Sequence, residues 1–135
     1  MNRDNSRIIL FSLLYILVTE IIYRTLLAFT DLYYLPIILT ISFNAAIYIY
    51  TGYLLKYAHL IYLKILLAAF ILSFFGHIML GFAIFILPIF ISNIPSNIDA
   101  FIGIIISFPF EFIIGTVLLL LGRWLSILNN ARKKG

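Results

Sequence analysis

Cysteine is absent from this chain of 135 residues, and charged residues are scarce. The missing cysteine excludes disulfide bonds, thiolate metal sites, iron–sulfur clusters and thiol nucleophiles. Charged residues make up only 10% of the chain, against roughly 25% in an ordinary soluble domain, whereas 64% of the residues are hydrophobic. This composition is typical of an integral membrane protein.

Several motifs that identify enzymes are also missing. The sequence contains no GxSxG, HExxH or HxxxH motif and no phosphate-binding glycine loop. No cofactor is therefore predicted, and enzymatic activity is disfavoured but stays open. The net charge of +4 does not indicate a nucleic-acid partner, because most basic residues cluster at the chain ends and in one short segment.

Four apolar runs are long enough to cross a bilayer as helices, since a hydrocarbon core of about 30 Å takes roughly 20 residues. They cover residues 8–29, 35–55, 60–85 and 100–121. The linkers between them are short, so we predict one domain over residues 1–135: an all-α, polytopic membrane protein folded as a compact four-transmembrane-helix bundle. The third run continues to Ile91, and Pro88 is expected to end or bend its helix.

The basic residues give the four spans an orientation. All but one fall on the same side of the membrane, and these are Arg3, Arg7, Lys56, Lys64, Arg123, Arg132, Lys133 and Lys134. Lysine and arginine are enriched in cytoplasmic segments, so both termini are predicted to be cytoplasmic. The opposite loops carry Asp31 and Asp99. No small-x-small cleavage pattern follows the first apolar run, and we expect that run to be a retained span.

Each predicted span contains one strongly polar side chain at a similar depth. The four are Glu20, Asn44, His77 and Glu111, and each lies about 12 or 13 residues from the basic residue at the cytoplasmic end of its helix. At a rise of 1.5 Å per residue, each side chain lies roughly 18 to 20 Å from that end, near the bilayer midplane. We therefore predict a polar layer between the helices.

Small residues at a spacing of four indicate which helix faces pack together, because they let helices approach closely. Gly103, Ser107 and Gly115 share such a face with Glu111. Ala69, Ser73 and Gly81 do the same for His77, and Thr40, Tyr48, Thr51 and Gly52 continue the face of Asn44. The polar layer is thus expected to face other helices rather than lipid.

Glu111 has no oppositely charged partner within its own helix, where it stands in the stretch FPFEFIIG. An ionised carboxylate inside the membrane costs several kcal/mol unless it is paired or protonated. His77 is the expected partner, with Asn44 as a hydrogen-bond donor. Glu20, by contrast, has Arg24 one helical turn away, and this pair either fixes the rotation of its helix or forms an ion or proton site.

His77 and Glu111 are also candidates for metal ligands, although hydrogen bonding across a helix interface is the commoner role of such residues. His59 precedes His77 by about five helical turns, or about 27 Å, along the same helix face. A haem held by His77 would therefore need its second axial ligand from another chain.

Three functions fit these features. The first is an oligomeric, proton- or cation-linked transport protein whose pathway forms between protomers. The second is a non-catalytic membrane subunit or assembly factor of a larger complex. The third is an intramembrane lipid-modifying enzyme that uses Glu111 and His77 as acid and base. The expected partners are the lipid bilayer, further copies of the chain or other membrane subunits, and anionic lipid at Arg132, Lys133 and Lys134.

Overall fold

The computed structural model describes residues 3–29, 34–55, 61–90 and 98–133, and within these ranges the chain forms four α-helices and no strand. The helices are α1 (Arg3–Phe29), α2 (Tyr34–Leu54), α3 (Ile61–Phe90) and α4 (Ile98–Arg132). Each covers all or nearly all of one predicted apolar run, so the all-α class is confirmed.

Three helices extend several residues beyond the predicted spans, and the first of them, α1, begins at Arg3 rather than at residue 8. Helix α3 continues through Pro88 to Phe90, so Pro88 does not end the helix. A proline removes a single backbone donor, and here the neighbouring residues keep their helical geometry. Helix α4 contains Pro109 and runs past Leu121 to Arg132, because the segment after the apolar run is still rich in leucine and arginine, which favour helix.

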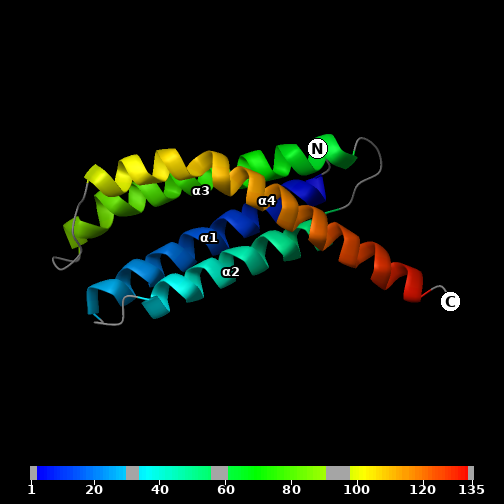
Figure 1. Cartoon of the computed structure of the whole chain (residues 1–135), viewed down its shortest axis with the longest axis horizontal. Coiled ribbons are helices and arrows are strands. Elements are labelled where there is room, and N and C mark those ends of the chain that lie inside the picture. The colour runs from blue at the N-terminus through cyan, green and yellow to red at the C-terminus, as the bar shows by residue number, and fades with distance from the viewer. Residues whose placement is uncertain (1–2, 30–33, 56–60, 91–97, 134–135) are drawn as a thin grey trace.

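The helices are arranged as two antiparallel hairpins, α1–α2 and α3–α4, which pack against each other (Figure 1). Helix α1 contacts α2 and α3, and helix α4 also contacts α2 and α3. Helix α1 begins and helix α4 ends toward the same end of the molecule (Figure 1). Helix α4 starts beside α3, changes direction, and crosses α2 before projecting beyond it (Figure 1).

The apolar core lies in the half of the molecule where α1 begins and α2 ends. Its buried members are Ile9, Leu13, Ile16, Tyr48, Leu55, Ile65, Ala68, Ala69, Leu72 and Leu119. The alanines of α3 are small enough for neighbouring helices to approach closely. The next turns of α3 carry Ser73 and His77, so the packed core ends where the polar side chains begin.

Glycines bring the backbones of α2 and α4 into direct contact at their crossing. A Cβ atom on Gly52 would overlap the carbonyl group of Leu119, and one on Gly122 would overlap the carbonyl oxygen of Ile49. Gly115 meets the ring of Tyr48, where a Cβ would lie 2.5 Å from a ring carbon. The missing side chains therefore set the distance between α2 and α4 and the position of Tyr48.

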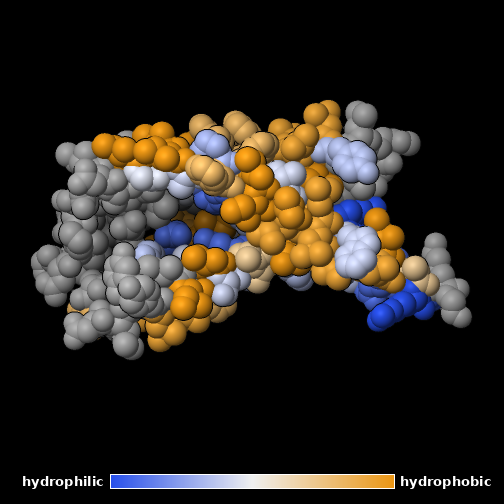
Figure 2. All heavy atoms as spheres, viewed as in Figure 1, coloured by the Kyte–Doolittle hydropathy of each residue, from blue (hydrophilic) through white to orange (hydrophobic). Residues whose placement is uncertain are grey.

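Large apolar side chains cover much of the outer surface, as the face of the molecule drawn in Figure 2 shows. Phe11, Phe43, Tyr62 and Phe110 each expose more than half of their surface. Monomeric soluble proteins rarely expose continuous apolar patches larger than a few hundred Å². Two segments, Asp4–Tyr23 with 20 residues and Ile105–Arg132 with 28, are long and apolar enough to cross a membrane.

Candidate functional site: a polar cluster between three helices

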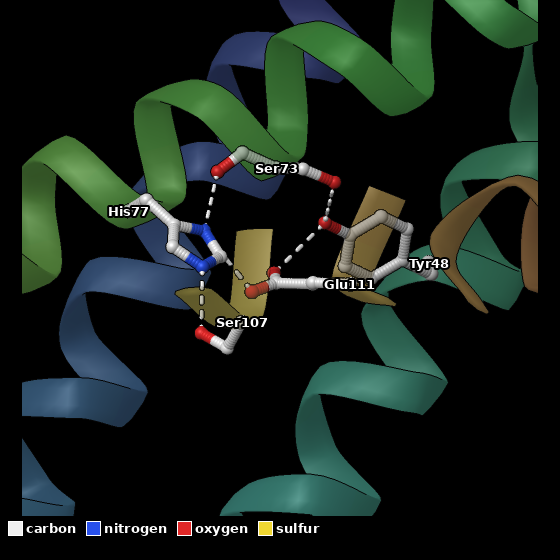
Figure 3. A network of polar contacts seen from close by, with 5 residues as sticks. All are labelled: Tyr48, Ser73, His77, Ser107 and Glu111. Atoms are coloured by element: carbon white, nitrogen blue, oxygen red, sulfur yellow. Dashed lines mark hydrogen bonds and ion pairs between the residues drawn. The ribbon is translucent and has the colours of Figure 1, made fainter. Parts of the chain in front are cut away.

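Five polar side chains from three helices meet at the inner edge of the apolar core (Figure 3). Helix α3 contributes Ser73 and His77, helix α4 contributes Ser107 and Glu111, and helix α2 contributes Tyr48. In both α3 and α4 the two polar residues are four positions apart, and this spacing places them on the same helix face. We call these five residues the polar cluster.

Glu111 lies at the centre of the polar cluster. The hydroxyl group of Tyr48 donates a hydrogen bond to Oε1 of Glu111 at 3.1 Å. The other carboxyl oxygen, Oε2, lies 3.1 Å from Nδ1 of His77. Both oxygens of this carboxyl group thus have a partner on another helix, as the energetics of a carboxylate in an apolar region require.

His77 has a partner at each ring nitrogen. Its Nδ1 lies 2.8 Å from the backbone carbonyl oxygen of Ser73, and its Nε2 lies 3.1 Å from Oγ of Ser107. The ring also packs perpendicular to the ring of Phe108, with ring centres 5.5 Å apart. These contacts on three sides hold the imidazole in one orientation.

The polar cluster has a buried end and an accessible end. Ser73 and Tyr48 are buried, and the Tyr48 hydroxyl lies 3.1 Å from Oγ of Ser73. His77 is only 8% exposed, whereas the side chain of Glu111 is 35% exposed and Ser107 is exposed. Figure 2 shows that this molecule is hollowed between its two hairpins and that hydrophilic residues lie in the hollow.

A second polar contact joins α1 to α2 closer to the apolar core. The hydroxyl groups of Ser12 and Thr51 lie 2.6 Å apart, and each also lies within hydrogen-bonding distance of the backbone carbonyl four residues earlier in its own helix. Both residues are buried. They contain no ionisable group, so we assign them a packing role between helices.

The structure brings together two of the residues predicted for the polar layer, His77 and Glu111. Asn44 is not part of their hydrogen-bond network, and within the described part of the chain its buried Oδ1 has no hydrogen-bond partner. The hydrogen bond predicted from Asn44 to Glu111 is not among the contacts of the described residues; Tyr48, one turn further along α2, donates to Glu111.

The ion pair predicted between Glu20 and Arg24 stays a prediction. Glu20 is buried on α1 and takes part in polar interactions. The side chain of Arg24 lies outside the described residues, as do Lys134 and His59. Arg132 and Lys133 are exposed at the end of α4.

Tyr48, Ser73 and Ser107 belong to the site although the sequence marked them only as members of packed helix faces. The sequence feature that pointed to them was their spacing of four residues from Asn44, His77 and Glu111. It showed which face each residue shares, but not that the three hydroxyl groups would meet the histidine and the carboxyl group.

The described residues do not assemble a metal centre. In the ranges that the structure covers, no three histidine, cysteine, aspartate or glutamate side chains gather around one point. His77 and Glu111 supply two ligands, and both already have hydrogen-bonding partners within the protein.

Comparison with known proteins adds no family to this description. The chain matches no protein-family model, no curated protein sequence and no solved structure. Its function must therefore be inferred from the chemistry of the polar cluster and from the surface around it.

Proposed function

We propose that the chain is a multi-pass membrane protein whose four helices each cross the bilayer, with both termini in the cytoplasm. Support comes from the apolar length of Asp4–Tyr23 and Ile105–Arg132, from the exposed apolar side chains of all four helices, and from the start of α1 and the end of α4 at one end of the molecule (Figure 1). The one-sided distribution of arginine and lysine supports the orientation.

Within this membrane protein, we propose that the polar cluster is the proton-binding site of a small proton-linked transport protein. The observation that carries the proposal is the contact of 3.1 Å between Nδ1 of His77 and Oε2 of Glu111, at the junction of three helices. Ionisable residues within membrane spans commonly mark ion pathways and proton relays. A histidine paired with a carboxyl group is suited to proton exchange near neutral pH.

The arrangement of donors favours a proton over a metal cation. Sodium, magnesium and calcium ions bind to oxygen atoms that face the ion with their lone pairs. Here one carboxyl oxygen of Glu111 accepts a hydrogen bond from Tyr48, and the other lies beside a nitrogen of His77. A cation would have to displace these groups, whereas a proton can be added to the existing network.

The accessible end of the polar cluster supports an oligomeric transport protein. Ser107 is exposed and the Glu111 side chain is 35% exposed although both contact His77 on α3, and the neighbouring residues Ile106 and Phe110 of α4 are exposed and apolar. Four helices enclose little volume, so we expect the transport pathway to run between this side of α4 and a neighbouring protomer.

The proposal is tested by proton flux in sealed vesicles that contain the purified protein and a pH-sensitive dye. Glu111→Gln keeps the shape and most hydrogen bonds of the side chain but removes its charge, so we expect a folded protein with at least about tenfold slower flux. Asp4→Asn, the same change in the first turn of α1, serves as the control and should retain wild-type flux.

The alternatives give different results in the same experiment. A non-catalytic membrane subunit would show no flux in wild type and would purify from its native membrane with other chains in fixed proportion. In that case Glu111→Gln should preserve assembly, and Glu111→Leu should weaken it by removing the carboxyl group that the Tyr48 hydroxyl and His77 contact. An intramembrane lipid-modifying enzyme would instead convert a lipid and lose that activity in Glu111→Gln.

A further inference from the structure

The hydrogen-bond partners of His77 determine which of its two nitrogens can exchange a proton. We propose that His77 always carries a proton on Nδ1, and that the site gains and loses its proton at Nε2 through the hydroxyl group of Ser107. The tautomer follows from the geometry of the structure alone. The role of Ser107 in exchange rests on the proposed function as a proton-binding site.

The tautomer is fixed by the backbone carbonyl group of Ser73. A carbonyl oxygen can only accept a hydrogen bond, so Nδ1 of His77, at 2.8 Å from it, must carry the hydrogen. Oε2 of Glu111 lies 3.1 Å from the same nitrogen and is attracted by the same N–H group. Without its proton, Nδ1 would point a lone pair at the carbonyl oxygen of Ser73 and at Oε2 of Glu111. Three acceptor atoms would then meet in a buried setting with no hydrogen between them, which is unfavourable.

Nε2 is consequently the nitrogen that changes its protonation state. In neutral His77 it is an acceptor, and the hydroxyl group of Ser107 donates to it across 3.1 Å. In charged His77 it carries a hydrogen, and the same hydroxyl group turns to accept. A serine hydroxyl can do both, since it has one donor and two acceptor sites. The bond between α3 and α4 therefore survives in both states.

Ser107 is also the exposed member of the polar cluster, whereas Ser73 and Tyr48 at the other end are buried. At the buried end, the Tyr48 hydroxyl donates to Glu111, so the Ser73 hydroxyl is left to donate to the oxygen of Tyr48. That end holds Glu111 in place with fixed donors. Protons can thus reach His77 from the Ser107 side without rearrangement of the buried side.

The groups that influence the charge of His77 come from every helix that packs around it. Helix α4 contributes Glu111, and helix α2 contributes Tyr48, which acts through Glu111. On helix α1, Ile16 faces Gly76, the residue before His77, and the ionisable residue one turn further along is the buried Glu20. Glu111 is the ionisable group in direct contact with the imidazole.

The tautomer can be measured by nuclear magnetic resonance of protein labelled with ¹⁵N-histidine, in the His59→Gln variant so that only His77 contributes. At high pH we expect Nδ1 to give the signal of a protonated nitrogen and Nε2 that of an unprotonated one, and on acidification the Nε2 signal should make the large shift while Nδ1 stays in the range of a protonated nitrogen. A proton on Nε2 at high pH would overturn the assignment, whatever the flux measurements give.

The role of Ser107 is tested by proton flux with two serine variants. Ser107→Ala removes the group that bonds Nε2, so we expect flux to fall about tenfold or more and Ser107→Thr, which keeps a hydroxyl group, to restore most of it. Ser12→Ala is the matched control, because it removes a buried hydroxyl group that lies outside the polar cluster, and it should lower flux less than threefold.

Equal losses in Ser107→Ala and Ser12→Ala would refute a specific role of Ser107 in the exchange. If the wild-type protein shows no proton flux at all, the proposed transport function fails, while the pH at which the Nε2 signal of His77 titrates still decides the role of Ser107. A titration of Nε2 that is unchanged in Ser107→Ala would then exclude Ser107 as a partner of the exchanging nitrogen.

Discussion

Tyr48 shows how a single side chain completes the surroundings of a buried carboxyl group. Its ring is part of the apolar core and rests on Gly115, while its hydroxyl group reaches both Glu111 and Ser73. Tyrosine suits this position because it combines a large apolar ring with one polar atom at the tip. Phenylalanine would fill the same volume but leave Oε1 of Glu111 without its donor.

We therefore predict that Tyr48→Phe destabilises the protein by about 1 to 2 kcal/mol, the cost of leaving buried polar atoms unsatisfied. Tyr50→Phe is the matched control, because Tyr50 lies on the same helix with 63% of its surface exposed and should tolerate the change within about 0.5 kcal/mol. Denaturation in detergent micelles, followed by circular dichroism, measures both. Equal effects would mean that the hydroxyl group of Tyr48 does not contribute.

The crossing of α2 and α4 depends on glycine because the two backbones touch there. At Gly52 and Gly122 any side chain would meet the main chain of the other helix, which cannot move aside as a flexible side chain can. Gly103 lies on the same helix as Gly122, but among the described residues no atom beyond its own helix backbone lies within 4 Å of a would-be Cβ. Substitutions at Gly52 and Gly122 therefore test the close packing of the helices, whereas a substitution at Gly103 tests helix propensity alone.

Gly52→Ala and Gly122→Ala should each destabilise the protein by about 1 to 3 kcal/mol, because the helices must separate to admit a methyl group. Gly103→Ala should be neutral or stabilise by up to about 1 kcal/mol, since alanine is the better helix former. Melting temperatures of the three variants in one detergent provide the comparison. If Gly103→Ala destabilised as much as the other two, helix crossing would not be the cause.

The membrane topology is a property of the complete bundle and can be tested without knowledge of its function. The proposed four spans place residue 97 and residue 130 on opposite sides of the bilayer. Because the chain has no cysteine of its own, Asn97→Cys and Asn130→Cys each introduce a single labelling site. We expect a membrane-impermeant thiol reagent to label Asn97→Cys in intact cells and Asn130→Cys only after the membrane is opened. Labelling of both in intact cells would refute the four-span arrangement.

The helices themselves were predictable from local sequence. An apolar run of this length has few alternatives to a helix in lipid, since a helix satisfies its own backbone hydrogen bonds. The rise per residue also places Glu20, Asn44, His77 and Glu111 along their helices before any packing is known. Helix ends were less predictable, as Pro88 shows, because the loss of one hydrogen bond does not decide whether neighbouring residues stay helical.

The partners of each polar side chain, by contrast, depended on tertiary packing. The rotation and crossing of α2 are set where Gly52 and Gly122 meet the main chain of the other helix, contacts between residues far apart in the sequence. That crossing brings Tyr48 rather than Asn44 to Glu111 and leaves the Asn44 oxygen without a partner in the described structure. A shift of one helical turn moves a side chain about 5 Å, more than the length of a hydrogen bond, so only the packed structure could decide which residues form the site.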